Sequence, residues 1–184
     1  MNEGKRFERD FKASMPEEAY FLRLSDPAAA FSPGEVTRFS PHNPYDCLIF
    51  IYPNLFTLEL KSTGGTSMSF WRRESSAASP MIKKHQIQGL LKASQYTGVV
   101  SGLILNFRTA SHTYFWEINM FVDYTGNTPK KSVNEKDVLA GGGIIIPQRR
   151  LSVNWRYDME EFINVTVGTG TKGLGRADAS CSGQ

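Results

Sequence analysis

The chain of 184 residues has a formal net charge of +3 and a pI near 8.9. This length fits one domain with a substantial core, and the mild basic excess permits nucleic-acid binding without requiring it. The two cysteines, Cys47 and Cys181, make neither a disulfide framework nor a zinc site. The sequence begins without an apolar signal core, and no apolar run approaches the ~20 residues that span a bilayer. We therefore expect a cytoplasmic protein with no membrane partner.

The first predicted elements are a helix and a short strand. Asn2 can cap a helix over residues 3–14, with Phe7 and Phe11 on its buried stripe. The run Tyr20–Leu24 is typical of a strand. The other faces of the helix carry basic side chains, which suit either a solvated helix or one that contacts phosphates: Lys5, Arg6, Arg9 and Lys12.

A long loop and a hairpin follow. Residues 25–44 are rich in Pro, Ser and Ala and lack periodicity, which predicts a loop that leads to Asp46. The β-branched and aromatic run Cys47–Tyr52 indicates a strand buried on both faces. After a turn at Pro53-Asn54, strict alternation over residues 56–61 indicates a second strand, antiparallel to the first.

This hairpin brings charged side chains together at its open end. If it is symmetric about Pro53-Asn54, Asp46 faces Lys61 and lies diagonal to Glu59, with the two carboxylate-bearing Cβ atoms roughly 7 Å or less apart. A Mg²⁺ ion could bind between these acids, because each ligand oxygen needs to lie only about 2.1 Å from it. A register slip of one residue would move Asp46 to the other face. Taken alone, Glu59-Leu60-Lys61 favours a solvated strand face, because this pattern is common on exposed strands.

The segment after the hairpin combines aromatic and basic side chains. Phe70-Trp71-Arg72-Arg73 suits nucleic acid through ring stacking and phosphate contacts, and equally suits a partly buried aromatic with solvated arginines. Ser79-Pro80 predicts the start of a helix of about 16 residues. Lys83 and Lys84 point away from its buried face, and His85-Gln86 lie in its first two turns.

The last third of the chain is predicted to hold further strands, a closing helix and a tail. The expected strands are 99–107, 113–120 and 141–147, and the expected helix is 158–163. Beyond Val165 the chain is rich in Gly, Ser and Thr. We therefore predict a single domain over residues 1–165 and a disordered tail over residues 166–184.

Several short motifs occur in the order found in one nuclease family. They are Gly4-Lys5-Arg6-Phe7-Glu8, Asp46, Glu59-Leu60-Lys61-Ser62-Thr63, Thr66-Ser67, His85-Gln86, and Gly102-Leu103-Ile104-Leu105-Asn106-Phe107 before Thr113-Tyr114-Phe115-Trp116. Together they resemble the RecU family of Holliday-junction resolvases, from Gram-positive bacteria and their phages, within the PD-(D/E)XK nuclease superfamily. The matches cover residues 2–120, and their order and spacing reverse the preference for a solvated strand face.

The resemblance implies an α/β fold with a restriction-endonuclease-like mixed β-sheet flanked by helices, and a homodimer. It implies a metal-dependent endonuclease that cuts branched DNA in recombination and repair. Two alternatives stay open: a repair or restriction nuclease on duplex or flapped DNA, and a catalytically silent DNA-binding module of the same fold. Junction-cutting members carry a stalk before the catalytic aspartate, and the interval 24–46 is too short for a full one, so junction selectivity does not follow from the resemblance.

The resemblance also implies roles for individual residues. Asp46, Glu59 and the Leu60 carbonyl would bind Mg²⁺, for which Mn²⁺ can substitute, and Lys61 would orient or help activate the attacking water. Phosphodiester hydrolysis needs a nucleophilic water and relief of the developing negative charge, and a carboxylate-held cation beside a lysine offers both. The residues expected to support the metal and water network are Glu8 and Gln86. The candidate DNA-binding residues are Lys5, Arg9, Arg72, Arg73, Lys83 and Lys84.

Overall fold

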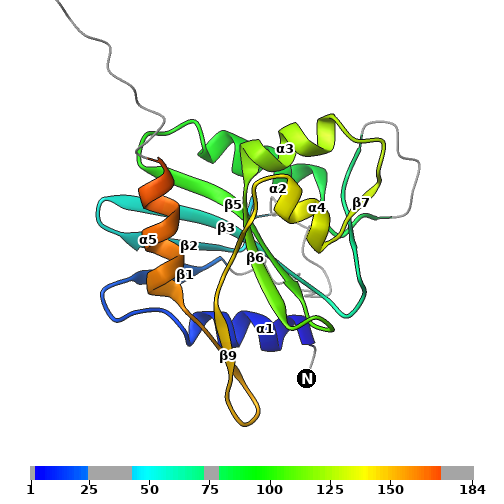
Figure 1. Cartoon of the computed structure of the whole chain (residues 1–184). Coiled ribbons are helices and arrows are strands. Elements are labelled where there is room, and N and C mark those ends of the chain that lie inside the picture. The colour runs from blue at the N-terminus through cyan, green and yellow to red at the C-terminus, as the bar shows by residue number, and fades with distance from the viewer. Residues whose placement is uncertain (1–2, 25–42, 73–78, 171–184) are drawn as a thin grey trace, which may run out of the picture.

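The structure is a computed structural model that describes residues 3–24, 43–72 and 79–170. At its centre lies a sheet whose strands, in spatial order, are β1 (Tyr20–Arg23), β2 (Cys47–Ile51), β3 (Asn54–Thr63), β5 (Val99–Phe107), β6 (His112–Glu117) and β8 (Ile144–Ile145), as Figure 1 shows. The pair β3 and β5 is parallel, whereas the other neighbouring pairs are antiparallel. The sheet is therefore mixed.

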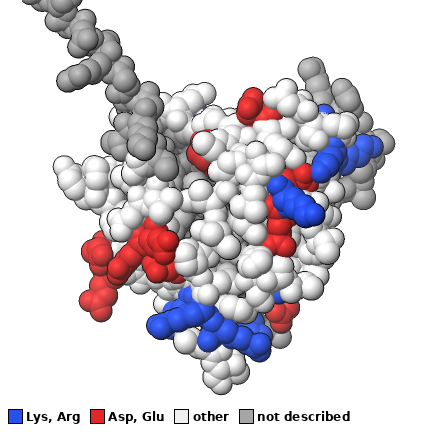
Figure 2. Space-filling view, viewed as in Figure 1, with Lys and Arg blue, Asp and Glu red and all other residues white. Residues whose placement is uncertain are grey.

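Helices and small strand pairs complete the described residues. The helices are α1 (Glu3–Lys12), α2 (Lys84–Ala93), α3 (Ile118–Gly126), α4 (Glu135–Ala140) and α5 (Met159–Gly170). The strand pairs are β4 (Met68–Ser69) with β7 (Ser132–Val133), and β9 (Gln148–Arg150) with β10 (Trp155–Tyr157). Figure 2, viewed from the same side as Figure 1, shows Lys and Arg side chains gathered at the lower edge, over α1 and β9. No helix of the described residues is long and apolar enough to cross a bilayer.

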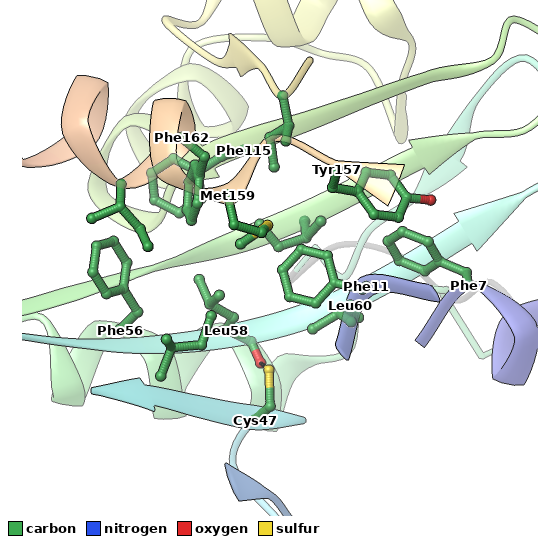
Figure 3. Close-up of a cluster of buried hydrophobic side chains, with 14 residues drawn as sticks. Phe7, Phe11, Cys47, Phe56, Leu58, Leu60, Phe115, Tyr157, Met159 and Phe162 are labelled. Carbon is green, nitrogen blue, oxygen red and sulfur yellow. Dashed lines mark hydrogen bonds between the residues drawn. The ribbon is translucent and has the colours of Figure 1, made fainter. Parts of the chain in front are cut away.

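Each face of the sheet is covered by its own apolar core. The first core joins one face to α1, α5 and β10, and Figure 3 shows Phe56, Phe115 and Phe162 of this core packed together, with ring centroids 5.6 Å apart for Phe56–Phe162 and 5.2 Å for Phe115–Phe162. The second core joins the other face to α2, α3 and α4. Helices on both faces of a mixed sheet confirm the predicted α/β fold class.

The alternation along β3 decides which side chains enter each core. Phe56, Leu58 and Leu60 are buried in the first core. Because successive strand residues point to opposite faces, Glu59 and Lys61 point to the face that carries α2. The acid and the lysine of the predicted motif therefore lie on the same face, as expected from the sequence.

The register of the β2–β3 hairpin differs from the predicted one. Cys47 faces Leu58 and Ile51 faces Asn54, so the turn consists of Tyr52 and Pro53 rather than Pro53 and Asn54. Proline suits this turn because its missing N–H removes no ladder bond there. Each β2 residue therefore faces a β3 residue two positions earlier in the chain than predicted. A displacement of two keeps each side chain on its face, because the side-chain period of a strand is two.

The helix predicted from Ser79-Pro80 begins later, at Lys84. The backbone of Ile82 continues an extended segment instead: its N–H donates to the Ser69 carbonyl at 3.0 Å, and its carbonyl accepts from Trp71 at 2.9 Å. Ser79-Pro80 is therefore not the helix cap, because Ile82, which follows it, pairs with Ser69 of β4 and with Trp71 just beyond β4.

Three predictions in the C-terminal half are also corrected. The strand expected over 113–120 ends at Glu117, whose side chain accepts from the N–H groups of Asn119 and Met120 at 3.1 Å and so starts α3. The strand expected over 141–147 is reduced to β8. The closing helix continues to Gly170, so residues 166–170 are helical rather than part of a tail. The remaining tail residues lie outside the described ranges.

Candidate active site

Asp46 lies just before β2, where the chain forms a β-bulge. Its backbone N–H donates to the Leu58 carbonyl at 3.0 Å, and Cys47 faces the same Leu58. Two consecutive residues opposite one residue make a bulge, which can re-aim a side chain. The Asp46 carboxylate is directed along β3, and its Oδ2 accepts the N–H of Leu60 at 2.8 Å. The Leu60 carbonyl points to the same strand edge as its N–H, toward the side of Asp46.

Glu59 is an acid held inside the protein, with 1% of its surface exposed. Its Oε1 lies 2.7 Å from the Lys61 ammonium and also accepts from the Gln86 amide. The start of α2 orients this amide, because Gln86 Oε1 accepts the backbone N–H of Lys83 at 2.9 Å. The amide nitrogen of Gln86 therefore faces Glu59 and holds its carboxylate.

Arg23, at the end of β1, joins two acids of the site and is absent from the predicted residues. Its Nη2 lies 2.9 Å from Glu8 Oε2, and its Nη1 lies 3.0 Å from Asp46 Oδ1. Nη1 also donates to the Asp46 carbonyl at 3.0 Å. The signal in the sequence was an arginine at the end of an otherwise apolar strand. The predicted residues that the structure brings together at this end of the sheet are Glu8, Asp46, Glu59, Lys61 and Gln86.

The acids of this cluster experience both burial and mutual repulsion. Burial raises the pKa of Glu59 from 4.5 to about 7; the Lys61 ammonium opposes this rise, and the Asp46 carboxylate adds to it. Burial also raises the pKa of Glu8, against the opposing effect of Arg23. Burial lowers the pKa of Arg23, but the carboxylates of Asp46 and Glu8 outweigh it and raise that pKa overall. When every group is ionised, the cluster carries net negative charge. It then contains three carboxylates, Glu8, Asp46 and Glu59, and two cations, Arg23 and Lys61.

The donor set of this cluster fits a hard divalent cation. Across residues 3–24, 43–72 and 79–170, no group of three or more His, Cys, Asp or Glu side chains is arranged to hold a metal ion. Mg²⁺, however, is commonly bound through one or two carboxylates together with water. The neighbouring Asp46 carboxylate repels the Glu59 carboxylate and adds to the rise in the pKa of Glu59. A cation bound between the two carboxylates would relieve this repulsion. In the metal-free protein, protonation of Glu59 relieves it instead.

Comparison with known proteins relates this chain to a prophage protein. The SPbeta prophage-derived uncharacterized protein YotM of Bacillus subtilis (strain 168) is 32% identical over 146 residues, which are 74% of this chain and 70% of YotM. The chain belongs to the YotM family. No protein-family model matches it. Among solved structures, Hjc of Archaeoglobus fulgidus, a Holliday junction resolvase from an archaeal hyperthermophile, aligns with a TM-score of 0.47 and 16% identity over 77% of this chain and 95% of Hjc.

In this member of the YotM family, the basic residues of α1 differ in their surroundings. Lys5 is exposed and close enough to Glu8 to lower the pKa of that acid in part. Arg9 is paired with Asp10 at 3.0 Å and donates to Asn154 Oδ1 at 2.8 Å. Arg9 thus ties α1 to the segment before β10, whereas Lys5 extends into solvent beside the cluster.

The aromatic and basic segment after β4 is mainly structural where it is described. Phe70 is 3% exposed within the second core, so its ring is not available for base stacking. Arg72 Nη1 donates to the carbonyls of Thr128 and Lys130, the latter at 2.8 Å. Arg72 therefore joins two loops. Arg73 lies outside the described residues.

Two exposed lysines lie at the start of α2, close to the cluster. Lys83 precedes the helix, and its backbone N–H is the group that orients Gln86. The Lys84 ammonium lies 4.9 Å from the centre of the Trp71 ring. Residues 25–42, where a stalk would be inserted, lie outside the described ranges.

Proposed function

We propose that this protein is a metal-dependent endonuclease that hydrolyses phosphodiester bonds in branched DNA, such as a Holliday junction, in recombination and repair. The observation that carries this proposal is the meeting of Asp46, Glu59 and Lys61 at one end of the β2–β3 hairpin, with the Glu59 carboxylate buried against the Lys61 ammonium at 2.7 Å. Such an arrangement of charges is costly to bury, and a purely structural hairpin gains little from it. The resemblance of the ordered motifs to RecU supplies the expectation of branched DNA.

In the proposed site, Asp46, Glu59 and the Leu60 carbonyl would hold Mg²⁺, for which Mn²⁺ could substitute. A bound cation of this kind supplies a nucleophilic water near neutral pH and relieves the negative charge that develops on the phosphate. Lys61 has three ammonium protons, one of which is directed at Glu59. The others suit a water or a phosphate oxygen, so Lys61 would orient the nucleophile and oppose the developing charge.

The surrounding residues of the site act as positioning groups in this proposal. Gln86 holds the Glu59 carboxylate, and its own orientation depends on the start of α2. Arg23 holds Asp46 and Glu8 in one chain of ion pairs. Partners of this kind that orient metal ligands commonly contribute about 10–100-fold to metal affinity or activity. Their effect would therefore be indirect, through the geometry of the two carboxylates.

A cleavage assay with matched variants tests the proposal. We expect the wild-type chain with Mg²⁺ to cut a mobile four-way junction in preference to a fork or a linear duplex. Glu59→Gln and Lys61→Ala should each abolish cleavage while DNA binding is retained, because both remove charge from the reacting centre. Glu160→Gln, on the exposed side of α5, is the control and should leave the rate unchanged.

The outcomes separate the candidate functions. Wild-type cleavage rates in both Glu59→Gln and Lys61→Ala would sink the site assignment. Equal cutting of all three substrates would favour a general repair or restriction nuclease. Binding without cleavage by the wild-type chain in Mg²⁺ or Mn²⁺ would instead indicate a silent DNA-binding module.

We also propose that the protein acts as a homodimer, as the RecU resemblance implies. Resolution of a four-way junction requires two cuts, which two copies of one site can supply. The surface of β1 and β2 that faces away from the first core supports this proposal, because Tyr20 and Phe50 are exposed there by 62% and 44%, and Tyr52, in the turn after β2, is exposed by 87%. Aromatic residues are enriched at protein interfaces. In addition, β1 is the last strand on its side of the described sheet, and its outer edge can pair with a second β1 about a two-fold axis.

A further inference from the structure

A polar pocket lies away from the candidate active site, between α1, the β5–β6 turn and the β9–β10 hairpin. It encloses about 280 Å³ and contains none of the predicted site residues. Phe7 and Tyr157, which line it, belong to the first core, whereas the Gln86 partner of Glu59 lies on α2 over the second core. The pocket is therefore on the opposite face of the sheet from Glu59 and Lys61.

Three arginines from separate elements line this pocket: Arg6 of α1, Arg108 of the β5–β6 turn and Arg150 of β9. Among the described residues, none of the three forms an ion pair. Arg6 donates to the Val153 carbonyl, and Arg108 Nη1 donates to Ser62 Oγ at 3.0 Å. These neutral acceptors hold two of the guanidinium groups in place without cancelling their charge.

The acids at the pocket leave an excess of positive charge. Asp10 is 2% exposed, is paired with Arg9 at 3.0 Å and accepts the backbone N–H of Trp155 at 3.1 Å, so its charge is already balanced. Glu3, at the exposed start of α1, is the other lining carboxylate. The arginines therefore outnumber the acids, in agreement with the basic patch over α1 and β9 in Figure 2.

The floor of the pocket is held by a chain of side-chain hydrogen bonds. Ser62 Oγ donates to Asn106 Oδ1 at 2.9 Å, and Asn106 Nδ2 donates to Thr113 Oγ1 at 2.8 Å. Thr113 Oγ1 donates to Gln148 Oε1 at 2.6 Å, and Gln148 Nε2 donates to the Ser111 carbonyl at 2.7 Å. The side-chain amides of Asn106 and Gln148 are thus each held by two hydrogen bonds, one at the oxygen and one at the nitrogen. A connected network of this kind makes a rigid floor, so the pocket is formed before any ligand enters.

We infer that this pocket binds a phosphate group, either on a DNA strand or on a free nucleotide. Arginine matches phosphate because its planar fork donates two parallel hydrogen bonds to the phosphate oxygens. Arg6, Arg108 and Arg150 line the pocket from three separate elements, and Trp155, which also lines it, is half-buried and has an aromatic ring on which a base can stack. The inference does not depend on the proposed nuclease activity, because no residue of the acid cluster lines the pocket.

Binding measurements in EDTA test this inference without any cleavage. The probes are a fluorescein-labelled single-stranded oligonucleotide, followed by anisotropy, and deoxyadenosine monophosphate, followed by calorimetry. Arg150→Gln is the test variant, because Arg150 is exposed and the substitution leaves the core intact. Arg156→Gln is the matched control: it removes the same charge from the neighbouring strand β10, at a position that does not line the pocket.

We expect Arg150→Gln to weaken the binding of at least one of the two probes about tenfold. Arg156→Gln should change the binding of either probe less than twofold. A loss for the mononucleotide identifies a free nucleotide as a source of the phosphate, and a loss for the oligonucleotide alone identifies a DNA strand. Equal affinities of the two variants for both probes would overturn the inference. Both probes are followed in EDTA, where no Mg²⁺-dependent cleavage takes place, so failure of the proposed nuclease and failure of this pocket remain distinguishable.

Discussion

Glu59 combines an apolar environment with a requirement for charge. Burial favours its neutral form, whereas the Lys61 ammonium at 2.7 Å favours the carboxylate. The neighbouring Asp46 carboxylate adds to the effect of burial, and the resulting pKa is about 7. In the metal-free protein, the acid is therefore protonated below neutral pH and ionised above it, within the range in which an enzyme works.

This raised pKa predicts a specific pH dependence of stability. The folded state binds the Glu59 proton more tightly than the unfolded chain, so its contribution to stability is complete below about pH 4.5 and is lost as pH rises through about 7. Glu59→Gln, which is always neutral, should therefore gain stability relative to the wild type across this window, by at most ~1.4 kcal/mol per pH unit. Urea unfolding in EDTA from pH 5 to pH 8 measures the difference. A difference that stays constant with pH, as expected for the control Glu160→Gln, would contradict the raised pKa.

At the level of elements, α2 approaches closely the segment that leads into β2. A Cβ atom on Gly89 would lie 2.5 Å from Pro44 Cβ and 2.8 Å from the Pro44 carbonyl oxygen. Contacts of this length do not occur between real side chains, so only glycine permits the observed distance. Gly89 lies one turn after Gln86 on the same helix, and Pro44 lies two residues before Asp46. The close approach therefore sets the position of Gln86 relative to both carboxylates.

Gly89→Ala should consequently destabilise the protein and reduce cleavage. Alanine favours a helix over glycine by about 1 kcal/mol, but overpacking against a backbone atom costs about 1–3 kcal/mol, and we expect the second effect to dominate. Gly126→Ala, near the end of α3, is the control because nothing lies within 4 Å of an added Cβ. Urea unfolding of both variants measures the difference. Equal stability of the two variants would show that α2 can move away without cost.

At the scale of the whole molecule, the proposed homodimer predicts a surface variant that separates the subunits. Phe50 is 44% exposed and faces Tyr20 across the β1–β2 pair. Phe50→Lys should raise the dimer dissociation constant at least tenfold, because a charge at the centre of an apolar contact is costly to bury. Leu139→Lys, which places the same charge at an exposed position of α4, is the control. Sedimentation velocity over a range of concentrations measures both, and a wild type that remains a monomer at every concentration would exclude the proposal.

The sequence by itself determined the local features of the protein. The helix at the start of the chain, the strand over residues 99–107 and the β2–β3 hairpin all follow from periodicity and turn residues. The proximity of Asp46 and Glu59 was predictable for the same reason, because one hairpin joins them and its side chains alternate between two faces. The turn position was not predictable to the residue, since Tyr52-Pro53 and Pro53-Asn54 both contain turn-forming residues.

Only the tertiary structure decided which distant elements complete the site. Arg23 meets Asp46 because β1 pairs with β2, and Gln86 meets Glu59 because Ile82 remains extended and α2 begins at Lys84. The bulge that turns the Asp46 carboxylate toward Leu60 depends in the same way on the pairing of two strands. Periodicity assigns a side chain to a face, but its partner depends on how separate elements pack. For this reason the acid pair was visible in the sequence, whereas its arginine and the arginine-lined pocket were not.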